Sequence, residues 1–431
     1  MVFFPAFPPC AAAQSDIGLA LDKAVSLALE NNLGLKKSLI DIASSAYSEK
    51  NLWSEIFPAI SATASAGYRS PLFSGGGFEF SGGGLSLSAG LGLSLGFNAG
   101  TSYSIKNIRL AHQNNLLKYE EASNLLSIQI TKLFFSLTAE WDNQNYLEEI
   151  LSLAQKQHER DQVSFKNGLI RELVLMQSRL AVENARYNLS AARTSYANNL
   201  GQFLVMLGMA QDADVSLSGE INVVRIDADA EELIRNHLPG RPDILRARQE
   251  IERLEYAARQ TGLQAKTPSL NVSVDWNAQG FDPFADALSA TARLSIPIDP
   301  WIPGTSRSQS VRKAGDSVEK AKLDLTMAEE SAKNEIRSLA ARLRNSWDAI
   351  LTARLSLEYA RRGYELTEQG FRNGTVESLA LEDARNNMAN ARQRLLQSEL
   401  SYFNMTLDLS AALNISWKNL IETFGAPDEK E

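Results

Sequence analysis

The sequence of 431 residues has almost none of the side chains that usually build redox or metal centres. It contains one cysteine, Cys10, which excludes an internal disulfide framework and a cysteine-based zinc site. Its three histidines, His112, His158 and His237, are far apart in the sequence and form no metal-binding motif. We therefore expect no metal, no cofactor and no metal-based catalysis.

Two kinds of long run are also missing. The 43 Lys and Arg residues are outnumbered by 51 Asp and Glu, and no basic run is present that would follow a phosphate backbone. This excludes nucleic acid as an expected partner. After the N-terminus the sequence has no stretch of about 18 apolar residues, so we expect no transmembrane helix.

The first thirteen residues, 1–13, are uncharged, mostly apolar and end in three alanines. They resemble the tail of a secretory signal, although the basic region that usually opens such a signal is missing, and an unstructured N-terminus is the alternative. Cys10 is a candidate lipoprotein acceptor. The preceding Phe7-Pro8-Pro9 is a poor match to a lipidation motif, which weighs against that interpretation.

Proline is absent between Pro71 and Pro239 and again between Pro303 and Pro427, so two long segments are free to form continuous helices. In the first segment, apolar residues step alternately by four and three positions, with one polar layer at Glu140/Gln144, as in a coiled coil. Adding 206 to each number finds the same register in the second segment. The matching layers are Leu126/Ile130 with Ala332/Ile336, Leu133/Leu137 with Leu339/Leu343, and Leu147/Leu151 with Ala353/Leu357. The chain therefore contains an internal duplication.

Each copy of the duplicated unit is expected to contain a helix, two strands, a long helix, a tip and a final helix. We place the first repeat at 14–226, the second at 227–420 and a C-terminal tail at 421–431. The strands are expected at about 59–69, 85–98, 269–278 and 288–298, and the tips at 167–169 and 373–375. A helix from about Thr101 to Lys166 would measure roughly 90–100 Å at 1.5 Å per residue, which a compact soluble domain does not need.

The expected strands alternate between apolar and small or polar residues. In residues 85–98 the apolar set includes Leu87, Leu91, Leu93 and Leu95. The strand length suits a tilted strand that crosses a bilayer, with these leucines facing lipid. A soluble sandwich is the alternative for any one such strand. However, four strands cannot close a barrel, so closure requires several chains. Two chains would supply eight strands with a filled interior, and three would supply twelve strands and an open lumen.

These features resemble the TolC-like outer-membrane efflux proteins over essentially the whole mature chain. The resemblance lies in Leu21–Ala24 with Leu27–Asn32, in Arg241-Pro242-Asp243, in Ser295-Ile296-Pro297 and in the two tip glycines, Gly168 and Gly374. It implies a mainly α fold with a membrane β part, in which a homotrimer forms a 12-stranded barrel in outer-membrane lipid and an α-barrel in the periplasm. It further implies a passive export channel of a tripartite efflux or type I secretion system. Its partners would be a periplasmic membrane-fusion adaptor and an inner-membrane pump of RND, ABC or MFS type.

The two tips are the first candidate site, because each places a glycine where two helices reverse direction. A helical hairpin needs no more than that for its structure. By resemblance, the same turns would meet the adaptor. The candidate docking residues are Asn167, Gly168, Leu169, Asn373, Gly374 and Thr375.

Acidic residues after the second tip are the second candidate site. Carboxylates on the inner face of a closed helical ring would select cations and repel one another, whereas a solvated acidic helix start is the alternative. The similar family has two acidic rings three residues apart at its aperture. Asp383 matches the second ring, Ala380 stands at the first, and Glu377 and Glu382 are further candidates.

No constellation of catalytic residues occurs in the sequence, so we do not expect an enzyme. Gly75–Gly77 and Gly82–Gly84 lack the Lys-Ser/Thr that completes a phosphate-binding loop. The alternative to an export channel is a non-conducting periplasmic coiled-coil scaffold or adaptor. Such a protein would share the helical hairpins but would not need lipid-facing strands, so the alternation in residues 85–98 favours the channel.

Overall fold

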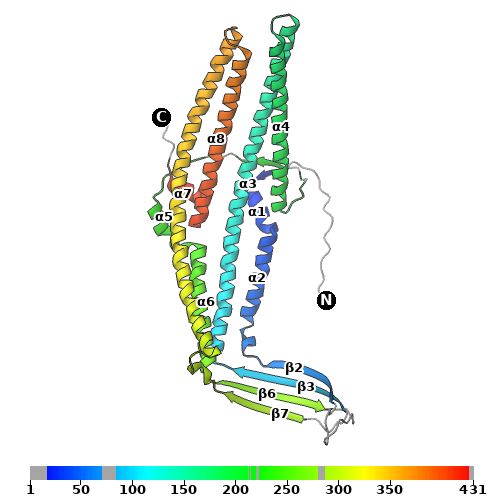
Figure 1. Cartoon of the computed structure of the whole chain (residues 1–431), viewed down its shortest axis with the longest axis vertical. Coiled ribbons are helices and arrows are strands. Elements are labelled where there is room, and N and C mark those ends of the chain that lie inside the picture. The colour runs from blue at the N-terminus through cyan, green and yellow to red at the C-terminus, as the bar shows by residue number, and fades with distance from the viewer. Residues whose placement is uncertain are drawn as a thin grey trace. The chain divides into compact units, whose positions relative to one another are not determined.

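The computed structural model describes residues 17–69, 84–211, 213, 215–219, 223–279 and 287–426. Its elements, drawn in Figure 1, are β1 (Ile17–Ala20), α1 (Leu21–Asn31), α2 (Leu33–Lys50), η1 (Leu52–Glu55), β2 (Ala59–Arg69), β3 (Gly84–Phe97), α3 (Thr101–Lys166), α4 (Glu172–Met206), β4 (Val215–Ser218), β5 (Arg225–Ile226), α5 (Ala230–His237), η2 (Leu238–Gly240), α6 (Pro242–Lys266), β6 (Ser269–Gln279), β7 (Ala287–Ser295), η3 (Asp299–Trp301), α7 (Ser306–Arg372), α8 (Ser378–Leu413), α9 (Trp417–Phe424) and β8 (Gly425–Ala426). None of the described helices is long and apolar enough to cross a membrane.

The chain divides into two compact units. The helical unit consists of Met1–Ser38, Tyr119–Pro242 and Glu330–Glu431, and the sheet unit consists of Leu39–Lys118 and Asp243–Glu329. The helices α2, α3 and α7 contribute residues to both units.

In the helical unit, α3 with α4 and α7 with α8 form two helical hairpins (Figure 1). The contacts between helices give the neighbour order α4-α3-α8-α7. Asn199 on α4 donates to Glu140 on α3 at 2.8 Å, Lys132 on α3 pairs with Asp408 on α8 at 2.5 Å, and the rings of Trp347 on α7 and Tyr402 on α8 are 5.3 Å apart. The layer therefore has two edge helices, α4 and α7.

The core of the helical unit repeats the duplicated heptads. Ile130 and Leu137 are fully buried in one cluster with Phe134 and Phe203. Their counterparts 206 residues later, Ile336 and Leu343, are buried in a second cluster. Each cluster also includes residues of a short strand pair formed by segments far apart in the sequence. The parallel strands β1 and β4 contribute to the first cluster, and β5, which pairs with β8, contributes to the second. The predicted internal duplication is confirmed.

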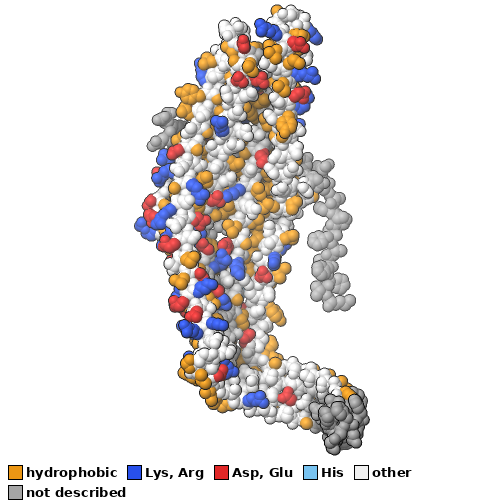
Figure 2. Space-filling view, viewed as in Figure 1, with side chains coloured by type: hydrophobic (Ala, Val, Ile, Leu, Met, Phe, Trp, Pro, Cys, Tyr) orange, Lys and Arg blue, Asp and Glu red, His pale blue; other side chains and the backbone are white. Residues whose placement is uncertain are grey.

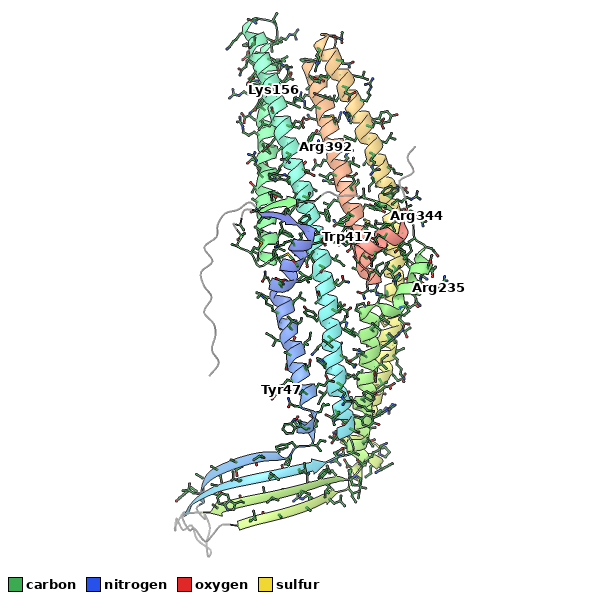
Figure 3. The ribbon with its side chains drawn as sticks, turned by 180° about the vertical axis from the view of Figure 1, so that it is seen from behind. Tyr47, Lys156, Arg235, Arg344, Arg392 and Trp417 are labelled. Carbon is green, nitrogen blue, oxygen red and sulfur yellow. The ribbon has the colours of Figure 1, made fainter. Side chains whose placement is uncertain are left out.

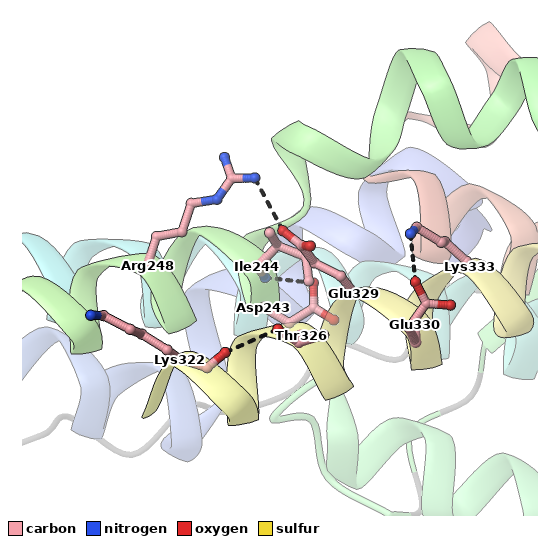
Figure 4. A network of polar contacts seen from close by, with 8 residues as sticks. All are labelled: Asp243, Ile244, Arg248, Lys322, Thr326, Glu329, Glu330 and Lys333. Carbon is pink, nitrogen blue, oxygen red and sulfur yellow. Dashed lines mark hydrogen bonds and ion pairs between the residues drawn. The ribbon is translucent and has the colours of Figure 1, made fainter. Parts of the chain in front are cut away.

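The sheet unit holds one antiparallel sheet in the order β2-β3-β6-β7. Its helices follow the corresponding order α2-α3-α6-α7. The hydroxyl of Ser45 on α2 lies 3.0 Å from His112 on α3, the rings of Tyr103 on α3 and Tyr256 on α6 are 5.9 Å apart, and Arg248 on α6 pairs with Glu329 on α7 at 3.3 Å (Figure 4). The edge strands β2 and β7 each pair on one side only within the described sheet.

Strand pairing places the apolar residues of all four strands on one face of the sheet. Leu91 lies opposite Ala62 and Trp276, and Leu93 lies opposite Ile60 and Val274. The opposite face carries mainly Ser, Thr, Gly, Asn and Asp, together with Arg293 on β7. On that face two positions of β3 have no room for a side chain. A Cβ at Gly90 would come within 2.5 Å of the Asn277 side chain, and a Cβ at Gly92 would come within 2.8 Å of the Asp275 side chain. The glycines of β3 therefore make room for the longer polar side chains of β6.

Candidate functional site: hairpin ends and sheet face

Both hairpin tips close by the same hydrogen-bond pattern. At the end of α3, Gly168 adopts φ +71°, its N–H donates to Phe165 O at 2.9 Å, and the N–H of Leu169 donates to Ser164 O at 2.9 Å. This is a Schellman motif, in which a left-handed glycine satisfies the last helical carbonyls. A positive φ is unfavourable for residues that carry a Cβ and costs glycine nothing, which explains why this position is a glycine.

The tip of the second hairpin repeats this geometry at an offset of 206. Gly374 has φ +73° and donates to Phe371 O at 3.1 Å, and Thr375 donates to Gly370 O at 2.9 Å. At both glycines the space that a Cβ would occupy is open. The six tip residues predicted from the sequence are all exposed on the chain.

The acidic candidates on α8 do not share one environment. Asp383 is exposed, as is Ala380 one turn earlier, and Glu377 is the exposed N-cap residue of α8. Glu382 is partly buried and lies with Leu381 and Arg385 against Gln157, Ser178 and Ala181 of the other hairpin. Burial raises the pKa of Glu382, and the nearby Arg385 guanidinium opposes that rise. Of the three predicted acids, Glu382 therefore faces the first hairpin rather than the free surface of α8.

A buried carboxylate, Asp161, lies inside the first hairpin close to its tip. Asp161 is only 5% exposed, and its Oδ1 accepts a hydrogen bond from the Gln157 side chain at 2.9 Å. Burial raises the pKa of Asp161, against the lowering effect of the hydrogen bond from Gln157. On the same helix face His158 bonds Ser178 of α4 at 2.9 Å. This polar cluster couples α3 to α4 near the tip.

A groove of about 790 Å³ separates α3 from α7 and α8 midway along the hairpins. Across it, the Arg392 guanidinium of α8 lies 4.2 Å from the ring centroid of Tyr146 on α3, which is a cation–π contact (Figure 3 labels Arg392). Arg354 on α7 pairs with Glu399 on α8 at 3.8 Å at the same groove. The Arg392–Tyr146 contact thus joins the two hairpins here, while the Arg354–Glu399 pair joins α7 to α8 within the second hairpin. Aromatic packing of Phe135 on Phe403, at 4.6 Å, joins the hairpins nearer their base.

Comparison with known proteins identifies the family. Two segments of the chain, residues 24–209 and 233–414, match the family model described as outer membrane efflux protein, and together they make up more than half of the chain. The chain belongs to the outer membrane efflux protein family. It is an outer-membrane protein that serves export, and the resemblance drawn from the sequence is confirmed.

Relatives and solved structures agree with this assignment. The toluene efflux pump outer membrane protein TtgC of Pseudomonas putida is 25% identical over 410 residues, which are 92% of this chain and 83% of TtgC. In structure, the chain is similar to the CmeC outer membrane channel of Campylobacter jejuni, with a TM-score of 0.74, 19% identity and coverage of 94% of this chain and 88% of CmeC. The outer membrane protein VceC of Vibrio cholerae gives a TM-score of 0.71 at 15% identity, with coverage of 92% and 96%.

The sequence did not reveal the polar contacts between and within the hairpins. Nothing in the heptad pattern distinguishes Asp161 or Arg392 from other polar residues on helices. The one available signal was a polar layer at Glu140/Gln144, which marked a break in the apolar seam. The structure places Gln144 in the buried interior and bonds Glu140 to Asn199 at 2.8 Å.

Proposed function

We propose that the chain forms a homotrimer that acts as a passive export channel through the outer membrane and across the periplasm. It would work in a tripartite efflux or type I secretion system, with a periplasmic membrane-fusion adaptor and an inner-membrane pump of RND, ABC or MFS type. No catalytic step and no cofactor enter this proposal. Opening would follow from docking to the adaptor and pump.

The observation that carries the proposal is a sheet with one apolar face and two open edges. Leu91, at 56% exposure, Leu87 and Leu93 stand exposed on that face, while Leu95 is partly buried. Lipid is the environment that suits an exposed apolar strand face, and unpaired strand edges within lipid must be satisfied by further strands. Three copies would supply twelve strands around a lumen lined by the polar face.

The edges of the helical layer support the same closure. The edge helix α4 exposes an apolar stripe at Leu173, Met176, Leu180 and Tyr187. The other edge helix, α7, exposes Leu351, Leu355, Tyr359 and Leu366. Residues at such spacings share one helix face, and apolar stripes on both edges of a layer suit burial against a neighbouring copy. Three copies would thereby close an α-barrel of twelve helical segments.

The exposed tips and acids fit the roles expected of them in such a channel. Asn167–Leu169 and Asn373–Thr375 would meet the adaptor, because exposed glycine turns allow another helix tip to approach closely. Asp383 would line the aperture, with Glu377 as the second candidate because it is exposed as well. The role of Glu382 would be to hold α8 against the first hairpin.

The alternative, a non-conducting periplasmic scaffold or adaptor, finds no support in the sheet unit. In a water-soluble scaffold, an uncovered apolar sheet face would expose its side chains to water, which is unfavourable. Two measurements test the channel directly. Detergent-extracted protein should come from the outer-membrane fraction as a trimer by light scattering, and it should produce single-channel currents in a planar bilayer. A water-soluble monomer that stays monodisperse without detergent would contradict the proposal.

A further inference from the structure

Two exposed apolar clusters lie at the end of the sheet unit where strands meet helices. The first, which we call the η1 cluster, is Trp53, Ile56 and Phe57, and the second, the η3 cluster, is Ile298, Trp301 and Ile302. The Trp53 side chain is 57% exposed, that of Trp301 67% and that of Ile298 72%. Figure 2 shows hydrophobic side chains gathered at this junction.

Local contacts of the aromatic rings and of neighbouring side chains order both clusters. The Trp53 and Phe57 rings form an edge-to-face pair at 5.0 Å, and Trp53 Nε1 donates to Asn51 Oδ1 at 3.3 Å. The Lys266 ammonium lies 5.4 Å from the Trp301 ring centroid. Asp299, two residues before Trp301, pairs with Arg307 at 3.0 Å. Rings that are already ordered lose little freedom when they bind a partner.

The two clusters belong to opposite edges of the sheet. The η1 cluster directly precedes β2, and the η3 cluster directly follows β7, and these are the two edge strands. Three strand spacings of roughly 4.8 Å put the two edges about 14 Å apart within one chain. The η1 cluster therefore lies at the β2 edge of the sheet and the η3 cluster at the β7 edge.

A second copy of the chain brings the two clusters together. Each neighbouring pair in the sheet is antiparallel, so β7 runs opposite to β2. When β2 of one copy pairs with β7 of the next, the pairing is again antiparallel, and the start of β2 at Ala59 comes beside the end of β7 at Ser295. The segments just outside these residues, with the two clusters, then lie side by side.

We propose that the η1 cluster of one protomer packs against the η3 cluster of the next and forms an apolar clasp between subunits at the junction of sheet and helices. This inference rests on the proposed homotrimer. The clasp would repeat at each subunit boundary and bury three exposed aromatic side chains of the sheet unit, those of Trp53, Phe57 and Trp301. It would also fix the register of closure, because a slip of one residue between β2 and β7 would turn every side chain of the strand to the wrong face.

Thiol cross-linking tests the clasp in the assembled protein. Phe57→Cys and Trp301→Cys are introduced together, and Cys10 is retained in all variants so that the single variants report any link through it. In membranes treated with a short bis-maleimide, the double variant should give covalent dimers and trimers on a denaturing gel. Neither single variant should do so, because Phe57 would meet Trp301 of the neighbour and not its own counterpart. The matched control, Leu93→Cys with Trp301→Cys, places the first thiol on a central strand and should stay monomeric.

The outcomes separate the clasp from the trimer. A trimer on a native gel without specific cross-linking of the double variant overturns the clasp and leaves the channel proposal intact. A second measurement uses brominated phospholipid, which quenches tryptophan fluorescence on contact. Trp53→Phe and Trp301→Phe should leave the extent of quenching nearly unchanged if the clasp shields both rings. A marked loss of quenching in either variant would assign that ring to lipid and overturn the clasp, whereas absence of any trimer would contradict the proposed function itself.

Discussion

The guanidinium of Arg392 lies 4.2 Å from the ring centroid of Tyr146 and joins the two hairpins of the helical unit across a polar groove. Burial raises the pKa of the Tyr146 hydroxyl, and Arg392 opposes that rise. The ring face, rather than the hydroxyl, is the group that meets the cation.

Removal of the cation should loosen α8 against α3. We expect Arg392→Gln to cost about 0.5–2 kcal/mol of stability, the usual range for a cation–π pair. It should also raise the frequency of channel openings in single-channel recordings. Tyr146→Phe is the matched control, because it keeps the ring face, and the hydroxyl has no hydrogen-bond partner among the described residues. Equal destabilisation by both substitutions would assign the effect to the tyrosine hydroxyl instead of the contact between the cation and the ring face.

The long helices and the strands were predictable from local pattern. The Pro-free segment predicted a helix from Thr101 to Lys166, and α3 has these bounds. Alternation predicted the strands because the apolar residues of each strand lie mainly on one face of the sheet and the small or polar residues on the other. β7 ends at Ser295, earlier than the alternation to Ile298 indicated, because Pro297 lacks the N–H needed to continue the ladder.

The segments that close the helical unit were not predictable, since they depend on partners far away in the sequence. The strands β1 and β4 have four residues each and pair across almost 200 positions. Likewise, the Tyr402 hydroxyl accepts from Ile226 N and donates to Val224 O, both at 2.9 Å. No local pattern around Tyr402 indicates these bonds. The direction in which Glu382 points also depends on packing between hairpins, so the sequence could not separate it from Asp383.

The two faces of β3 should respond differently to charge. Leu91→Arg should impair membrane insertion and cost about 2–4 kcal/mol if the residue lies near the bilayer midplane. Ser88→Arg, on the polar face beside Ser65, should leave assembly intact and lower single-channel conductance by narrowing the lumen. Trimer yield and conductance are the measurements. Equal loss of trimer in both variants would contradict the assignment of the lipid-facing side.

A bulky residue at the tips should uncouple the channel from its adaptor. Gly374→Trp or Gly168→Trp should abolish adaptor cross-linking and efflux while the trimer stays folded, because the space around both glycines is open. Gly374→Ala introduces the same strain at φ +73° without the bulk and should retain most efflux. If the tryptophan variants keep normal efflux and adaptor cross-linking, the tips have no docking role.

The buried Asp161 should make the first hairpin more stable in mild acid. Its pKa is raised in the folded state, so the folded protein takes up a proton at a higher pH than the unfolded chain does. Stability should therefore increase as the pH falls through the raised pKa towards the ordinary value of a carboxyl group. His158 and Arg160 are the charged or titratable neighbours that favour the ionised form, and they limit this effect.

Asp161→Asn should remove the cost of a buried charge. We expect a higher melting temperature than the wild type at pH 7 and a smaller difference at pH 4, measured by circular dichroism in detergent. Glu159→Gln, an exposed carboxylate on the same helix, is the control and should change neither value. A melting temperature of Asp161→Asn below that of the wild type at pH 7 would show that the ionised carboxylate is needed.

The aperture prediction depends on which acidic side chains at the start of α8 are exposed on the surface of one chain. Asp383 and Ala380 are both exposed and lie one turn apart, whereas Glu382 is partly buried against the first hairpin. Three copies of Asp383 around a threefold axis would attract cations to the opening. Asp383→Asn should therefore reduce cation over anion preference and weaken block by multivalent cations, with little change in trimer stability because the side chain is solvated.

Two companion variants make that test specific to Asp383. Ala380→Asp would add a second acidic ring one turn away and should strengthen cation block. Glu382→Gln removes an equal charge from a side chain that faces α3 and α4, so it should leave selectivity unchanged. If Asp383→Asn keeps the selectivity and cation block of the wild type, Asp383 does not line the aperture, and the exposed Glu377 becomes the residue to neutralise next. If Glu382→Gln alone changes selectivity, Glu382 and not Asp383 is the acid that lines the aperture.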